Sequence, residues 1–111
     1  MRLINWFRGR LTNRGKAISR YQRGITKAKK HDQQGAIDDY TDAIDMPYAP
    51  SDVIAMAMLN RALVQVAIGE FKKGVDDLSA VLAMDGAPTN VKEMAKQKLA
   101  RRESRTRNQN K

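Results

Sequence analysis

Apolar and polar positions along this chain recur at the three- and four-residue spacing of amphipathic helices. This spacing predicts five helices, over about residues 16–30, 33–46, 51–68, 70–84 and 90–102. Pro47 and Pro50 can end the second helix, because proline has no amide proton and crowds the residue before it. Ser51 or Asp52 can cap the third helix, and Gly69 can supply the left-handed residue that ends it.

The whole pattern repeats after 38 residues. Identical or similar residues then coincide, among them Arg23 with Arg61, Gly24 with Ala62, Ala36 with Gly74, Asp39 with Asp77, and Pro50 with Pro88. The first part of the unit returns a third time, with Ala100 in the place of Gly24 and Ala62. A period of this length is typical of solenoids built from helical hairpins. We therefore expect an all-α fold, a short α-solenoid of antiparallel helix pairs with about five helices.

The same pattern predicts how the chain is divided. A basic amphipathic segment covers residues 1–15, a helical domain covers 16–104, and a disordered basic tail covers 105–111. Within the domain we expect repeat 1 over about 16–50, repeat 2 over about 51–88, and a capping helix over about 89–104. Asn90 and Glu93 have the spacing of a capping box at the start of that last helix. Gly24, Ala62 and Ala100 are expected at equivalent close crossings of helices.

Several of these residues resemble the tetratricopeptide repeat family over about residues 17–100. The resemblance rests on small residues at Gly24 and Ala62, on Ala36 with Tyr40, and on Gly69 in the turn, together with the run Leu59-Asn60-Arg61-Ala62 and the closing Pro88. The period here is longer than the family's usual length of about 34 residues. The resemblance implies a non-enzymatic adaptor or scaffold that binds a peptide or protein partner in a groove lined by the first helix of each pair.

Carried over position by position, the resemblance implies a partner-binding groove with residues from the first and third helices. These are Ile18, Tyr21, Gln22, Ile25, Lys29, Met56, Leu59, Asn60, Leu63 and Val66. Asn60 matches an asparagine that hydrogen-bonds peptide backbone in some family members. Ile25 and Tyr21 stand where the family's carboxylate clamp has polar or basic residues, so we expect a more apolar groove. The alternative, with about even weight, is that Leu59, Leu63 and Val66 belong to the core.

Charge is distributed unevenly along the chain. Residues 1–30 carry ten basic and no acidic residues, 31–90 carry three basic and ten acidic, and 91–111 carry eight basic and two acidic, which gives the net charge of +9. The alternative function is therefore an anion-binding module that contacts nucleic acid or an anionic membrane surface through its termini. Its candidate residues are Arg2, Arg8, Arg10, Arg14, Lys16, Arg20, Arg23, Lys27 and Lys30.

The segment 1–14 allows more than one interpretation. Trp6 and Phe7 lie among arginines, so the segment could rest on an anionic membrane surface, serve as an organelle transit peptide, or bind another anion. The interpretation that we favour is that its aromatic side chains pack back onto the first helix.

Catalytic and cofactor sites are not indicated. Asp38, Asp39 and Asp42 form the spacing of a magnesium-binding motif, but no second acidic segment accompanies them and a solvated helix face is the favoured reading. His31 has no second imidazole or thiolate with which to share a metal ion and is expected in a turn. We expect no enzyme activity, cofactor, metal or small-molecule substrate.

Two features bear on compartment and assembly. The chain has no cysteine, which is compatible with a reducing cytoplasm, and no apolar run of the ~20 residues that span a bilayer. We expect a cytoplasmic protein, with peripheral membrane association and homo-oligomer formation left open.

Overall fold

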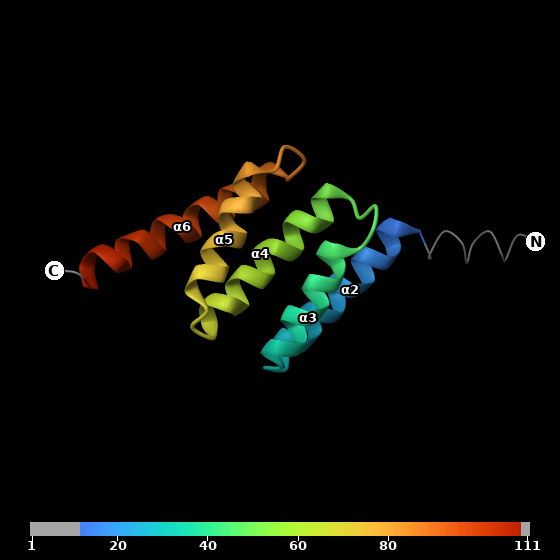
Figure 1. The fold of residues 1–111 in the computed structure, drawn as a ribbon, viewed down its shortest axis with the longest axis horizontal. Helices are drawn as coiled ribbons and strands as arrows, with labels where there is room; N and C mark the ends of the chain where they lie inside the picture. Colours follow the sequence, from blue (N-terminus) through green and yellow to red (C-terminus); the bar gives the residue numbers. More distant parts are fainter. Residues whose placement is uncertain (1–11, 110–111) are drawn as a thin grey trace, which may run out of the picture.

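The computed structural model describes residues 12–109. These residues form helices and no strand, so the predicted all-α fold is confirmed (Figure 1). The helices are α2 (Asn13–Lys29), α3 (Gln33–Asp45), α4 (Ser51–Ala67), α5 (Phe71–Ala83) and α6 (Thr89–Gln109). The basic segment predicted over 1–15 lies almost entirely outside the described residues.

The helices stack as hairpins side by side. Helix α2 pairs with α3 and α4 pairs with α5, while α3 packs against α4 and α5 against α6. Helix α2 also contacts α4, and α4 contacts α6, so the first helix of each unit touches the first helix of the next. The result is an elongated body of 67 × 31 × 19 Å, with α6 at one end and α2 near the other (Figure 1).

Two apolar clusters hold the stack together. One joins α3 to α4 through Ala36, Tyr40, Ala43 and Ala57, with side chains of α2 packed against it. The other joins α4, α5 and α6 through Ala55, Leu59, Ala62, Leu78, Val81, Val91 and Ala95. Each cluster lies at a junction between units, so neither hairpin buries its apolar face alone.

Close contact between helices depends on small residues, as the repeat predicted. A Cβ atom added at Gly24 would lie 2.5 Å from Cε1 of Tyr40, so α2 can approach α3 only because this position has no side chain. Ala62, which matches Gly24, is fully buried on α4. Gly74, which matches Ala36, is buried on α5. A Cβ atom at Gly74 would lie 2.7 Å from Cγ2 of Val66.

The third predicted crossing is wrong, because Ala100 is exposed. Gly24 and Ala62 each face the second helix of their own hairpin, whereas no such helix follows α6 in the described part of the chain. Helix α6 is also longer than expected. It continues to Gln109, so residues 105–109, predicted as part of a disordered tail, are helical.

The turns inside the two hairpins are the same. His31 and Gly69, 38 residues apart, both have positive φ, at 63° and 88°. After each helix the next two amides bond back to the last turn. The Asp32 amide donates to the Lys27 carbonyl at 2.9 Å, and the Glu70 amide donates to the Gln65 carbonyl at 2.8 Å. This is the Schellman arrangement, which requires a left-handed residue after the helix.

The helix starts differ from the prediction. Pro50 is the N-cap of α4, and neither Ser51 nor Asp52 caps the helix through its side chain. Helix α6 begins at Thr89, so Asn90 lies within its first turn and not at the cap position of a capping box. Side chains do cap α2 and α3: Thr12 Oγ1 and Asp32 Oδ1 accept from amides three residues ahead, at 3.2 and 3.0 Å.

Arg61 links the two helices of the second unit to α3 of the first. Arg61 of α4 donates to both carboxylate oxygens of Asp77 on α5, at 2.7 Å each, and to Thr41 of α3 at 3.0 Å. The hydrogen bonds to Asp77 raise the pKa of Arg61. In the amide orientation that satisfies both ends of its side chain, Gln65 donates through its nitrogen to the same carboxylate at 3.0 Å. The side chain of Asp77, which is only 11% exposed, is thus held by three donors.

Candidate binding site

The residues of the predicted groove lie in different surroundings. Tyr21 and Ile25 pack against the α3–α4 cluster, and Leu59 is 4% exposed within the other cluster. For Leu59 the core interpretation is therefore correct. Gln22 and Lys29 are exposed, and Ile18 and Met56 are half-buried. Leu63 and Val66 line an open hollow, while Gln22 lines a separate depression on the surface of α2.

Asn60 is engaged within the protein. Its Nδ2 donates to the carbonyl of Met56 at 2.8 Å and to the hydroxyl of Tyr21 at 3.2 Å. The Tyr21 ring in turn lies against Tyr40, with ring centroids 6.0 Å apart. Asn60 thus ties α4 to α2, and a peptide would have to compete for both donor hydrogens of its amide.

An open hollow lies between the second hairpin and α6. It has a volume of about 160 Å³. Its floor is apolar and comes from two helices, with Leu63 and Val66 on α4 and Val75 and Leu78 on α5. Its other wall is entirely basic and comes from α6, with Lys98, Arg101, Arg102 and Arg105. The C-terminal half of α6 extends away from α5 toward the end of the chain (Figure 1).

The 38-residue repeat explains why this junction is open. The floor residues correspond to Ile25, Ala28, Ile37 and Tyr40 at the first junction, and the four basic residues correspond to Asn60, Leu63, Val64 and Ala67. At the first junction Val64, Ile25 and Ala28 all pack against the α3–α4 cluster. At the second junction the place of Val64 is taken by Arg102. A charged head keeps access to water, so α6 does not close onto the apolar floor.

The basic residues of α6 form one stripe. Lys98, Arg101, Arg102 and Arg105 follow the spacing i, i+3, i+4 and i+7, which places them on one helix face. Within residues 12–109 none of the four makes an ion pair with a carboxylate. Arg101 and Arg105 are exposed. The rim of the hollow therefore carries positive charge that no neighbouring acid in the described structure neutralises.

Arg102 divides the hollow from a second, more open trough. Its guanidinium carbon lies 3.9 Å from the centre of the Phe71 ring, a cation–π contact between α6 and the start of α5. The trough beyond it is lined by Phe71, Val75, Thr106 and Arg107 among others, with a volume of about 600 Å³. Phe71 is 41% exposed even with the guanidinium over its ring. Apolar surface thus continues on both sides of Arg102.

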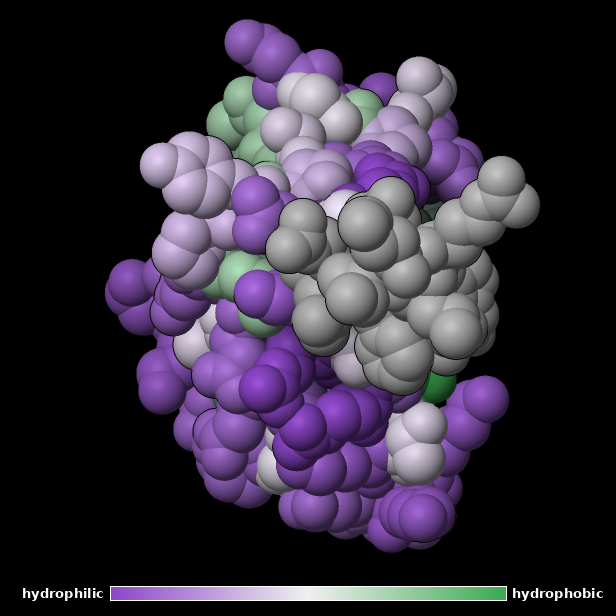
Figure 2. Space-filling model, turned by 90° about the vertical axis from the view of Figure 1, so that its right-hand side faces the viewer, coloured by the Kyte–Doolittle hydropathy of each residue, from purple (hydrophilic) through white to green (hydrophobic). Residues whose placement is uncertain are grey.

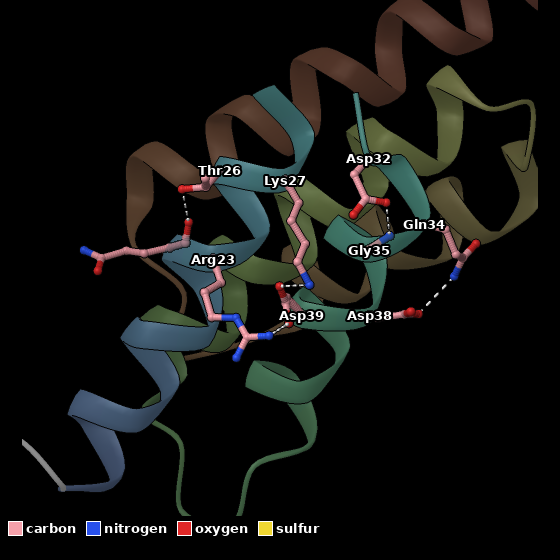
Figure 3. A network of polar contacts seen from close by, with 9 residues as sticks. Arg23, Thr26, Lys27, Asp32, Gln34, Gly35, Asp38 and Asp39 are labelled. Atoms are coloured by element: carbon pink, nitrogen blue, oxygen red, sulfur yellow. Dashed lines mark hydrogen bonds and ion pairs between the residues drawn. The ribbon is translucent and has the colours of Figure 1, made fainter. Parts of the chain in front are cut away.

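The predicted basic stripe on α2 is partly neutralised. Arg23 and Lys27 converge on Asp39 of α3, which is 3% exposed, while Asp38 points away toward Gln34 (Figure 3). The nitrogen-to-oxygen distances to Asp39 are 3.4 Å from Arg23 and 2.9 Å from Lys27, the second an ion pair without hydrogen-bond alignment. The solvated reading is correct for Asp38 and wrong for Asp39.

Arg14 is also paired, with Asp52 of α4. Its two terminal nitrogens lie 3.1 and 2.9 Å from the two carboxylate oxygens. This hydrogen bonding lowers the pKa of Asp52 and raises that of Arg14. Of the remaining predicted anion-binding residues of α2, Lys16 and Lys30 are exposed and Arg20 is half-buried. Lys30 lines a surface depression together with Arg23 and Lys27.

The end of the stack at α2 shows mostly hydrophilic side chains, with small apolar areas between them (Figure 2). Arg2, Arg8 and Arg10 lie outside the described residues, as do the aromatic side chains of the N-terminal segment. The interpretations of that segment stay predictions.

The four rim residues were not among the predicted site residues. The signal was present in the repeat, because positions occupied by Asn60, Leu63, Val64 and Ala67 become basic one unit later. A switch from apolar to charged residues at a position that packs between units indicates an interface left open.

Within the described residues there is no group of three His, Asp or Glu side chains placed to hold a metal ion. None of the helices there is both long and apolar enough to cross a bilayer. The hollow offers apolar contact and positive charge, which suit binding and supply no nucleophile with a paired base. Comparison with known proteins found no matching family model, no matching curated protein and no matching solved structure.

Proposed function

We propose that this protein is a non-enzymatic protein-interaction module, similar to tetratricopeptide repeats, that binds a peptide segment of a partner in the hollow between α4, α5 and α6. One observation carries the proposal. The apolar floor of Leu63, Val66, Val75 and Leu78 stays open at the second junction, whereas the corresponding surface is packed at the first. Open apolar surface beside convergent polar groups is the usual form of a binding site.

The ion pairs of α2 disfavour the alternative, an anion-binding module that contacts nucleic acid or an anionic membrane surface. Arg14, Arg23 and Lys27 are paired with carboxylates of the same chain. Phosphate contacts would in addition leave the apolar floor unused, since they need only positive charge. We propose a cytoplasmic location, with which the lack of cysteine is compatible.

The test is a selection of displayed random peptides on the immobilised full-length protein. Two variants are selected in parallel: Leu63→Asp, which puts a charge on the floor, and Arg101→Glu, which changes an exposed side chain and leaves the fold intact. Lys16→Glu on α2 is the matched control. We expect enriched peptides that bind the native protein and the control but neither hollow variant. Enriched peptides that bind both hollow variants as well as the native protein would contradict the proposal, as would the absence of any enriched peptide.

A further inference from the structure

The chemistry of the hollow restricts what can fill it. From its size and charge, and resting on the proposed function above, we infer that the partner segment is acidic and inserts one large apolar side chain, with carboxylates next to that side chain pairing with Lys98, Arg101, Arg102 and Arg105.

The volume of the hollow limits how many apolar side chains the peptide can insert. The hollow measures about 160 Å³, and a protein cavity of about 150 Å³ holds one benzene molecule. One phenyl or branched aliphatic side chain therefore fills it, whereas a whole helix, about 10 Å across, does not. The floor of Leu63, Val66, Val75 and Leu78 offers such a side chain apolar contact from two helices.

The basic rim predicts the charge of the peptide residues on either side of the inserted apolar side chain. From Lys98 to Arg105 the stripe extends over about 10 Å of helix, at 1.5 Å per residue. An extended peptide covers that length with about three residues, at roughly 3.3 Å each. Several carboxylates along a peptide can thus each meet a different cation, while a single lipid headgroup or free phosphate would meet only one or two.

Two other candidate occupants, the N-terminal segment of the chain and a second copy of the protein, fit the hollow less well. The chain's own segment 1–11 carries Arg2, Arg8 and Arg10 and no acid, so the rim would repel it. A second copy could offer the exposed Tyr48 that follows Asp45, but each copy has a net charge of +9, which opposes association.

The experiment is a fluorescence-anisotropy titration of the full-length protein with a labelled short peptide that carries one central phenylalanine between runs of glutamate and aspartate. Three comparison peptides replace the phenylalanine by serine, the acids by their amides, or the acids by lysine. We expect saturable binding of the first peptide, and weakening by about tenfold or more for each replacement. Added salt should lower the affinity of the acidic peptide but should not change the difference in affinity between the phenylalanine and serine peptides.

Two exposed rim positions supply the protein variants. Arg101→Glu and Arg105→Glu should each lower the affinity for the acidic peptide by about tenfold. Lys96 is an exposed residue of α6 outside the hollow, so Lys96→Glu should change this affinity by less than about twofold. Circular dichroism of each variant confirms that the helices are retained.

Other outcomes overturn this inference in distinguishable ways. If displayed peptides need Leu63 but carry no acidic residues, the proposed function stands and the inference on the partner is wrong. Equal binding of a single-stranded oligonucleotide, with the same loss in Arg101→Glu, would make the site a general anion site. Sedimentation that shows Arg101-dependent self-association would make the occupant a second copy.

Discussion

Val64 and Arg102 occupy the same position in successive units but lie in opposite surroundings. Val64 packs against the cluster between α3 and α4, whereas Arg102 places its guanidinium 3.9 Å from the centre of the Phe71 ring at the edge of an open hollow. One repeat thus closes a junction with an aliphatic side chain and the next leaves it open with a charged one. The first junction is closed and stabilises the stack, and we propose that the second binds a partner.

Small residues at the close crossing of α4 and α5 should be needed for stability. We predict that Ala62→Leu, at a fully buried position, lowers the free energy of unfolding by about 1–3 kcal/mol because the added atoms force the two helices apart. Ala100→Leu is the matched control, at the equivalent but exposed position of α6, and should change stability by less than about 0.5 kcal/mol. Urea unfolding followed by circular dichroism measures both. Equal effects at the two positions would refute the packing described here.

Removing one partner of the ion pair between Arg61 and Asp77 should lower the stability of the protein. Asp77→Ala removes the partner of a guanidinium that is only 17% exposed, so we predict a loss of about 3 kcal/mol in unfolding free energy. Asp76→Ala is the neighbouring control. Asp76 pairs with Lys72 at the surface, where the side chains are 64% and 90% exposed, and its loss should have almost no effect. Chemical denaturation of the two variants would show similar midpoints if burial of this pair were unimportant.

His31 should be replaceable with a gain in stability. Its φ of 63° lies in the left-handed region, where a residue with a Cβ atom costs about 1–2 kcal/mol. We predict that His31→Gly raises the free energy of unfolding by about 1 kcal/mol. The reverse change at the equivalent position, Gly69→Ala, should lower it by a similar amount. Thermal melting tests both, and a lower melting temperature for His31→Gly would count against this account of the turn.

Stability at alkaline pH should depend on Tyr40. Burial, with a smaller contribution from Tyr21, raises the pKa of Tyr40 from 10.0 to about 12. A group whose pKa is higher in the folded protein stabilises it fully below the unfolded pKa, so this contribution is lost as the pH rises from about 10 toward 12. We predict that, between pH 8 and pH 11, the free energy of unfolding of Tyr40→Phe falls by about 1 kcal/mol less than that of the native protein. Urea titrations at the two pH values decide, and identical losses would exclude Tyr40 as the cause.

Much of the scaffold could be predicted from the repeat. The close contacts at Gly24 and Ala62 and the left-handed turn at Gly69 follow from small residues that recur at a fixed spacing. The exposure of Ala100 did not follow, because it depends on whether another helix packs there. Equivalent sequence positions predict equivalent surroundings only where the neighbouring elements are also repeated.

The candidate site was harder to predict, since it depends on how helices distant in the sequence are placed. Asn60 was expected to face a peptide, but its amide lies within reach of Tyr21 once α2 and α4 stand side by side. Asp38 and Asp39 are neighbours in sequence and differ in exposure only because α2 covers one of them. Leu63 and Val66 were predicted, whereas the basic wall opposite them was not.

We propose that basic residues on α6 keep the apolar hollow open for a partner. The decisive variant gives the second junction the residues of the first, with the combined changes Lys98→Asn, Arg101→Leu, Arg102→Val and Arg105→Ala. Parallel anisotropy titrations of this variant and the native protein with the acidic phenylalanine peptide give the decisive comparison. We predict that the variant melts at a higher temperature and no longer binds the peptide. Unchanged peptide affinity in a folded variant would contradict the account.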